Sequence, residues 1–168
     1  MIEPFESKFT QDEWITVRLG PASACTLVMA SSPSGLTGLV AETQAIALAM
    51  RELGLASQSA FVRELLHPTQ APAAAPREAF KSIEDAKEQL LNRVRQAAFL
   101  VDSRISAGDA LEYKQLIMSV AARTAQAALE GGFFGLGGVQ VSDAERGVLA
   151  ELRGQLRLGE SGSSLTVT

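Results

Sequence analysis

The chain has 168 residues, of which 46% are hydrophobic and 20% are charged, a composition that excludes an intrinsically disordered protein. Fifteen basic and nineteen acidic residues give a formal net charge of −4. The basic residues are scattered and aromatic residues make up only 5% of the chain, so neither phosphate contacts nor base stacking favour a nucleic-acid partner.

The cysteine content and the N-terminal residues predict a cytoplasmic protein. Cys25 is the only cysteine, which excludes an internal disulfide and suits a reducing compartment. The first residues lack the basic region and apolar core of a secretory signal. The longest dense apolar run, residues 22–30, is far shorter than the roughly 20 residues that a membrane-spanning helix requires, so we expect no membrane partner.

The first predicted helix has a complete start signal. Thr10 and Glu13 are spaced as a capping box, in which each side chain accepts a hydrogen bond from the other residue's backbone N–H. Phe9 and Trp14 flank this box at the positions of a hydrophobic staple. The pattern predicts a helix that begins at Gln11.

Glycine and proline divide the residues that follow. The pair Gly20 and Pro21 is expected to end the first helix, with Pro21 as the first residue of a second helix that runs to Ser31. This second helix is apolar on nearly all sides, which predicts a place in the centre of a bundle. A third helix is expected over residues 39–53, where apolar residues recur at helical spacing.

The third helix and a proline-rich segment close the first half of the chain. Gly54 is expected to end the third helix as a left-handed cap, and a short helix follows over residues 59–66. Residues 67–77 carry a proline at every fourth position and predict an extended, semi-rigid linker. This linker divides the chain into the halves 9–66 and 78–158.

The second half has the clearest helical periodicity. Ser82 is expected to cap a long amphipathic helix, and residues 106–109 begin the next helix, which runs to Glu130. The last helix begins at Ser142 with another capping box, and residues 159–168 predict a flexible tail. The apolar positions of the long helix are Ile83, Ala86, Leu90, Val94, Ala97, Val101 and Ile105.

These elements predict an all-α fold, a bundle of six to seven helices in a single domain over residues 1–158. No segment alternates convincingly with the period of a strand. The glycine-rich stretches 34–38 and 131–138 lie about 100 residues apart, each between two similar helical arms. This correspondence indicates a duplicated helix-loop-helix unit.

The glycine-rich loop of the second half is the strongest candidate for a functional site. Gly135, Gly137 and Gly138 tolerate the positive φ of a tight turn, and Phe133 and Phe134 precede them. One interpretation is structural, with the phenylalanines filling the core. The other is a binding loop, in which free N–H groups at the start of the last helix hold an anion. The loop lacks the lysine of a phosphate loop and the strand that precedes a dinucleotide fingerprint.

Each glycine-rich loop is followed by a carboxylate at the start of a helix. Glu42 follows Gly35 in the first loop, and Glu145 follows the second loop. Negative charge is favoured at this end of a helix, so capping is the first interpretation. Binding of a divalent metal is the alternative, but the loops offer few oxygen ligands and we predict no metal site.

No catalytic set stands out from the sequence. His67 is the only histidine and stands at a helix end, where a cation is stabilising, and no base and orienting group for catalysis accompany it. Cys25 lies inside an apolar helix and is interpreted as a small core residue rather than a reactive thiolate. We therefore expect no enzymatic activity and no cofactor.

The second glycine-rich loop also carries a resemblance. The run 127–138, continued by residues 141–145, resembles a GGFxGxGGxxVSxxE-like motif of small all-helical bacterial proteins of uncharacterised function. More loosely, the repeated helix, turn, glutamate, helix pattern resembles the tellurite-resistance TerB-like proteins, whose acidic loops are associated with metal. Ser34–Gly35 and Gly131–Gly132 stand where that family has an aspartate–glycine turn, so the resemblance implies fold more than a metal function.

Two functional hypotheses follow. The first is a non-enzymatic helical protein, a protein-interaction or scaffold module that binds a protein partner or associates with itself. The second is a small-ligand or divalent-metal-binding stress-response protein that uses the glycine-rich loops. The residues predicted to take part are Gly35, Glu42, Phe133, Phe134, Gly135, Gly137, Gly138 and Glu145.

Overall fold

The computed structural model describes residues 3–31, 39–67, 80–130 and 141–159, with the backbone alone described at 39–45 and 128–130. These residues form six α-helices and one short 3₁₀ helix and contain no strand, which confirms the all-α fold class. The elements are η1 (Phe5–Lys8), α1 (Gln11–Ser31), α2 (Leu39–Ala56), α3 (Ala60–Leu65), α4 (Ile83–Arg104), α5 (Ala107–Glu130) and α6 (Asp143–Gln155).

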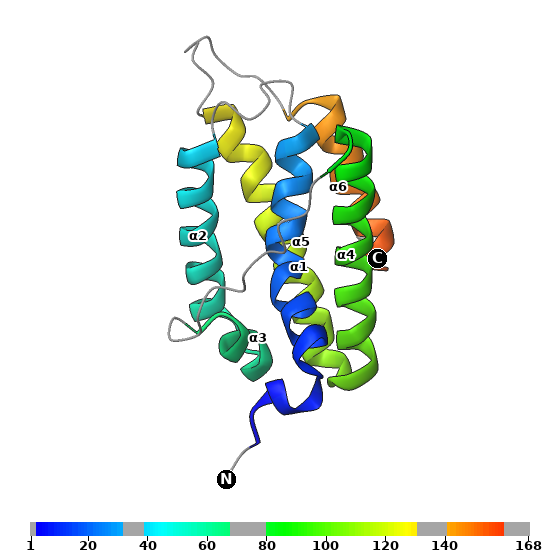
Figure 1. The fold of residues 1–168 in the computed structure, drawn as a ribbon. Coiled ribbons are helices and arrows are strands. Elements are labelled where there is room, and N and C mark those ends of the chain that lie inside the picture. Colours follow the sequence, from blue (N-terminus) through cyan, green and yellow to red (C-terminus); the bar gives the residue numbers. More distant parts are fainter. Residues whose placement is uncertain (1–2, 32–38, 68–79, 131–140, 160–168) are drawn as a thin grey trace, which may run out of the picture.

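The helices form a bundle around α1 and α5. Helix α1 packs against α4, α5 and α6, and α5 contacts every other α-helix. Helix α2 stands at one edge of the bundle, opposite α4, and packs mainly on α5 and on the short α3 (Figure 1). Among the described residues, Tyr113 of α5 is the largest side chain that is fully buried.

The helix starts predicted at Gln11 and near Ser59, Ser82, Ser106 and Ser142 are confirmed. Thr10 and Glu13 form the capping box, with Thr10 N–H donating to the Glu13 carboxylate (2.8 Å) and Glu13 N–H donating to Thr10 Oγ1 (3.3 Å). The rings of Phe9 and Trp14 lie 5.6 Å apart, as the staple requires. The hydroxyls that cap α3, α4, α5 and α6 belong to Ser59, Ser82, Ser106 and Ser142.

The predicted break at Gly20 and Pro21 is wrong, because α1 continues through both residues. Proline has no N–H, so Pro21 cannot donate to the carbonyl four residues earlier, that of Val17. The hydroxyl of Tyr113 on α5 donates to this carbonyl instead, at 2.7 Å. A side chain from another helix therefore supplies the hydrogen bond that the proline removes.

Gly20 is required by the same contact. A Cβ atom at this position would collide with the Tyr113 hydroxyl and would lie 3.1 Å from the Cβ atom of Ala97 on α4. The glycine therefore lets α4 and α5 approach α1 at one level of the bundle. It does not end the helix.

The predicted end of α2 at Gly54 is also wrong. The helix continues to Ala56, and the φ of Gly54 lies outside the left-handed region. A Cβ atom at Gly54 would lie 3.0 Å from side-chain atoms of Leu66, just after α3. Close approach of two segments, and not backbone conformation, accounts for this glycine.

The apolar side of α4 is largely as predicted. Leu90, Val94, Ala97 and Val101 are buried against the rest of the bundle. Ile83 is an exception, because its side chain is 61% exposed at the first residue of the helix. A helical period identifies the side of a helix that faces the core, but not how far along its length neighbours reach.

Several predictions concern parts of the chain outside the described residues. The proline-rich linker, apart from its first residue, the glycine-rich stretches 34–38 and 131–138, and most of the tail belong to these parts. The duplicated helix-loop-helix unit and the single domain therefore remain predictions.

We predict that Tyr113→Phe lowers the free energy of unfolding by about 1–3 kcal/mol, because it leaves the buried Val17 carbonyl without its donor. The loss should be smaller in a Pro21→Ala background, where the substituted residue has a backbone N–H that can donate to the same carbonyl. Urea unfolding of the wild type, both single variants and the double variant measures this coupling. Equal losses in the two backgrounds would show that the hydroxyl does not substitute for the missing amide.

Candidate functional site

Most of the residues that the sequence proposes for a site lie outside the described part of the chain. These are Gly35, Phe133, Phe134, Gly135, Gly137 and Gly138. Glu42 is the fourth residue of α2, at a position where the backbone alone is described. The binding role of the glycine-rich loops therefore stays a prediction.

Glu145 is the one proposed residue whose side chain is described, and it caps its own helix. Its carboxylate oxygen Oε2 accepts hydrogen bonds from both the N–H and the hydroxyl of Ser142, each at 2.9 Å, and the side chain is only 2% exposed. The Ser142 hydroxyl in turn accepts from Glu145 N–H at 3.2 Å. The capping interpretation of Glu145 is confirmed.

The described part of the chain contains no group of three or more His, Cys, Asp or Glu side chains that could hold a metal ion. Cys25 is buried on α1, and burial raises the pKa of its thiol to about 11, although the Thr124 side chain opposes that rise. His67 is exposed just after α3, and its N–H donates to the Glu64 carbonyl at 3.2 Å. The core interpretation of Cys25 is confirmed.

A cluster of serines and carboxylates joins α3 to α5. Ser57 donates its hydroxyl to Glu112 at 2.6 Å, and Ser59 donates its N–H to the same carboxylate oxygen at 2.9 Å. The Ser59 hydroxyl donates to Asp109 at 2.5 Å and accepts from Val62 N–H at 3.1 Å. Each group in this cluster is bonded within the fold, so its arrangement serves to cap α3 and attach it to α5.

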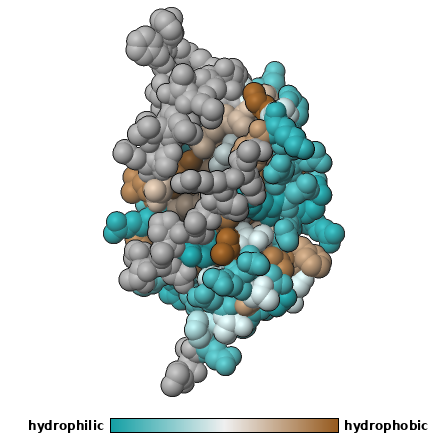
Figure 2. All heavy atoms as spheres, in the orientation of Figure 1, coloured by the Kyte–Doolittle hydropathy of each residue, from teal (hydrophilic) through white to brown (hydrophobic). Residues whose placement is uncertain are grey.

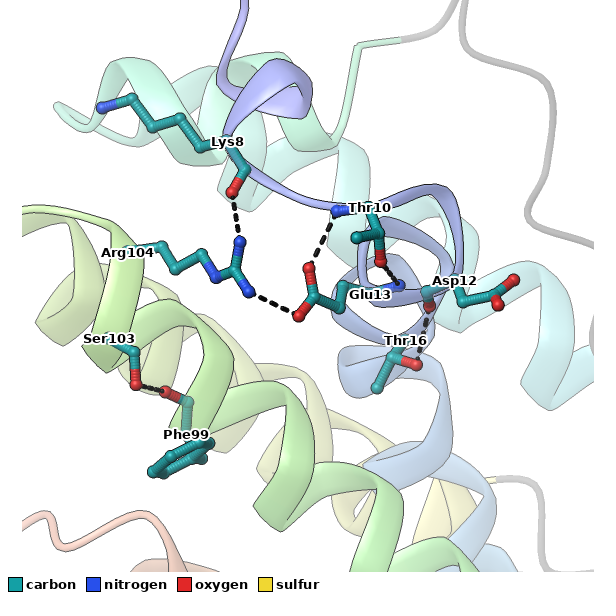
Figure 3. A network of polar contacts seen from close by, with 8 residues as sticks. All are labelled: Lys8, Thr10, Asp12, Glu13, Thr16, Phe99, Ser103 and Arg104. Carbon is teal, nitrogen blue, oxygen red and sulfur yellow. Dashed lines mark hydrogen bonds and ion pairs between the residues drawn. The ribbon is translucent and has the colours of Figure 1, made fainter.

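A second polar network ties the end of α4 to the start of α1 (Figure 3). The Arg104 guanidinium donates to the Lys8 carbonyl at 2.9 Å and to the Glu13 carboxylate at 2.6 Å. The backbone N–H of Thr10, with help from the Thr10 hydroxyl and Arg104, holds the pKa of Glu13 below its usual value. This network also completes a capping box and has a structural role.

The outer side of α2 offers a different kind of surface. Leu48 and Leu55 are 58% and 78% exposed, although both are large apolar side chains. They stand seven residues apart, two helical turns, so they share one side of α2. Arg51 and Glu52 lie between them and are also exposed. We call these four residues the α2 outer face.

The α2 outer face lies beside a shallow groove between α2 and α5. Leu48 and Glu52 line it from α2, and Arg123, Thr124 and Ala127 line it from α5. The Glu52 carboxylate pairs with the Arg123 guanidinium at 3.0 Å across the groove. Hydrophobic surface is visible at the left edge of the molecule in Figure 2, on the side where Figure 1 shows α2.

Leu48 and Leu55 were not part of the site proposed from the sequence. Their signal was present, because Ile46, Met50 and Leu53 define one side of the helix and the two leucines fall on the opposite side. An apolar pair at a spacing of seven residues, outside the core-facing side of a helix, indicates a second apolar side of that helix.

Comparisons with known proteins add no relative: no family model, no curated protein and no solved structure matches this chain. Among the described helices, none has the length and apolar content needed to cross a bilayer.

We predict that Cys25 in the native protein reacts with Ellman's reagent at pH 8 far more slowly than in the protein unfolded by urea. A pKa raised from 9.0 to about 11 lowers the thiolate fraction by about a hundredfold, and burial blocks access as well. The stabilising effect of the neutral thiol is complete below pH 9 and is lost as the pH rises towards 11. Rapid, complete labelling of the native protein would contradict the core assignment.

Proposed function

We propose that this chain is a non-enzymatic helical interaction protein, and that it associates with a second copy through the α2 outer face. The observation that supports the proposal is the order of the four side chains along the helix, Leu48, Arg51, Glu52 and Leu55. Read in either direction, the order is apolar, charged, charged, apolar, and the two charges are opposite.

This order makes the α2 outer face complementary to itself. When two copies of α2 pair antiparallel about a two-fold axis between residues 51 and 52, Leu48 of each copy lies opposite Leu55 of the other. In the same register Arg51 of each copy lies opposite Glu52 of the other. A two-fold interface of this kind uses the same patch on both subunits, as most homodimers do.

The size of the apolar contribution sets the expected affinity. Burying the exposed parts of four leucines contributes about 4–8 kcal/mol. Association of two proteins costs about 4–15 kcal/mol in lost freedom of motion. The two exposed ion pairs add up to about 1 kcal/mol each and mainly fix the register. These magnitudes support a weak dimer whose population rises with protein concentration.

Further support comes from the polar groups of the described residues. The carboxylates and hydroxyls that come together, around Glu13, Glu112 and Glu145, accept or donate hydrogen bonds that cap helices. A general base or a nucleophile has to be within reach of a substrate, whereas these groups already serve the fold. This favours a protein that works through its surface.

We predict that sedimentation velocity over a range of concentrations shows a monomer–dimer equilibrium for the wild type, and that Leu48→Glu with Leu55→Glu removes the dimer. Both leucines are exposed, so the melting temperature of this variant should stay near that of the wild type. Leu111→Glu on α5, where the leucine is 46% exposed, is the matched control and should leave dimerisation unchanged.

Charge reversal tests the register of the proposed pair. Arg51→Glu places like charges opposite each other and should weaken the dimer. Because Glu52 also pairs with Arg123 of its own chain, the rescue combines Arg51→Glu, Glu52→Arg and Arg123→Glu, which restores opposite charges across the interface and within the chain and should recover the dimer. A wild type that stays monomeric at millimolar concentration, or a dimer that survives the double leucine substitution, would show that α2 is not the interface. A triple charge variant no tighter than Arg51→Glu would reject the antiparallel register.

A further inference from the structure

A second surface lies on the other side of the bundle, in a groove between α4 and the end of α6. Its volume is about 680 Å³. Phe99 of α4 stands at this groove with its side chain 67% exposed, and its ring points away from α1 (Figure 3). Gly154 and Arg157 line the groove from the α6 side.

One position on the α6 side is occupied by a residue that the local backbone does not favour. Arg157 has a φ of 52°, the left-handed conformation in which glycine is preferred. Gly154 lies inside α6, where a Cβ atom would meet nothing within 4 Å; the same is true of Gly147 in this helix, so Gly154 provides open space beside α6 and is not by itself a sign of a site. A residue other than glycine at positive φ is a departure of the kind found at binding sites.

The backbone around Arg157 shows why its conformation is left-handed. Leu158 N–H donates to the Arg153 carbonyl at 3.2 Å, and Arg157 N–H donates to the Gly154 carbonyl at 3.1 Å. These are the two hydrogen bonds of a Schellman motif, with Arg157 at the position that glycine usually takes. These hydrogen bonds use only backbone atoms, so they do not account for an arginine side chain at this position. The Arg157 side chain lines the groove.

The charge of the groove is positive. Arg95 is held in place by Gln155, whose Oε1 accepts from Nε at 2.8 Å, and by Asn92, whose Oδ1 accepts from Nη1 at 3.1 Å. Within the described residues, the remaining nitrogen, Nη2, makes no hydrogen bond. The carboxylate of Asp102 also lines the groove but is neutralised by Lys114, at 2.7 Å. The charges of Arg95 and Arg157 are therefore not balanced within the groove.

We propose that this groove binds an acidic peptide segment of a partner protein that carries at least one large apolar side chain. The ring of Phe99 packs on the apolar side chain, and Arg95 and Arg157 pair with carboxylates on either side of it. Gly154 lets the peptide backbone approach α6 closely. The inference rests on the proposed role as an interaction protein, but it is independent of the α2 outer face.

The test uses a fluorescein-labelled peptide of alternating glutamate and leucine, with an alternating lysine and leucine peptide and a short single-stranded DNA of equal negative charge as comparisons. Anisotropy should show binding of the glutamate peptide in preference to both. Phe99→Ala and Arg95→Gln should each weaken it by about tenfold. Phe80→Ala and Arg153→Gln are the matched controls, because both residues are exposed and do not line the groove.

Arg157→Gly separates binding from stability. Glycine removes the cost of the left-handed conformation, so the melting temperature should rise by about 2–4 °C while peptide binding falls by about tenfold. In ¹⁵N-resolved NMR spectra, peptide should shift the resonances of residues 92–103 and 154–157. The proposal would be overturned if these variants bound the glutamate peptide as the wild type does, or if the peptide shifted resonances elsewhere on the bundle. Equal binding of the lysine peptide or tighter binding of the DNA would also overturn it.

The dimer interface on α2 and the peptide groove between α4 and α6 can be tested independently of each other. The monomeric variant Leu48→Glu with Leu55→Glu should bind the glutamate peptide as the wild type does. Loss of peptide binding in this variant, with the fold intact, would place the peptide at α2 and overturn the assignment of the groove. Failure of the wild type to dimerise, with normal peptide binding, would leave the groove proposal standing and remove the α2 interface.

Discussion

The hydrogen bond from Tyr113 to the Val17 carbonyl is the contact on which the bundle depends. It replaces the backbone hydrogen bond that Pro21 cannot make, so α1 remains one helix of 21 residues that α4, α5 and α6 can all pack against. Burial raises the pKa of the Tyr113 hydroxyl, which therefore keeps its proton and stays a donor. The Tyr113 ring also lies 5.8 Å from Phe61, which connects the same contact to α3.

Helix α5, which holds Tyr113, also forms ion pairs with the helices on both sides of it. Its Lys114 pairs with Asp102 on α4, and its Arg123 pairs with Glu52 on α2. These pairs are partly exposed and contribute little stability by themselves. Because they come from one rigid helix, they position the charged rims of two separate surfaces relative to the same core.

The elements of the fold could be predicted where their cause is local. Capping boxes use residues three positions apart, so the starts at Thr10 and Ser142 follow from the sequence alone. The roles of Gly20 and Gly54 could not be predicted, because each glycine makes room for a side chain that tertiary packing brings close. That side chain is Tyr113 at Gly20 and Leu66 at Gly54. Without those partners, turn chemistry is the natural interpretation of a glycine.

The candidate surfaces were harder to predict than the helices, because exposure depends on which side of a helix its neighbours leave uncovered. The helical period alone places Leu48 and Leu55 opposite the core-facing side of α2, but only the fold shows that α5 and α3 cover that other side and leave the two leucines 58% and 78% exposed. Phe99 likewise belongs to an amphipathic helix whose core-facing side is occupied by other residues. The two proposed interfaces also differ in chemistry, because one is complementary to itself and the other is basic. They lie on opposite sides of α5 (Figure 1), so occupancy of one would leave the other accessible.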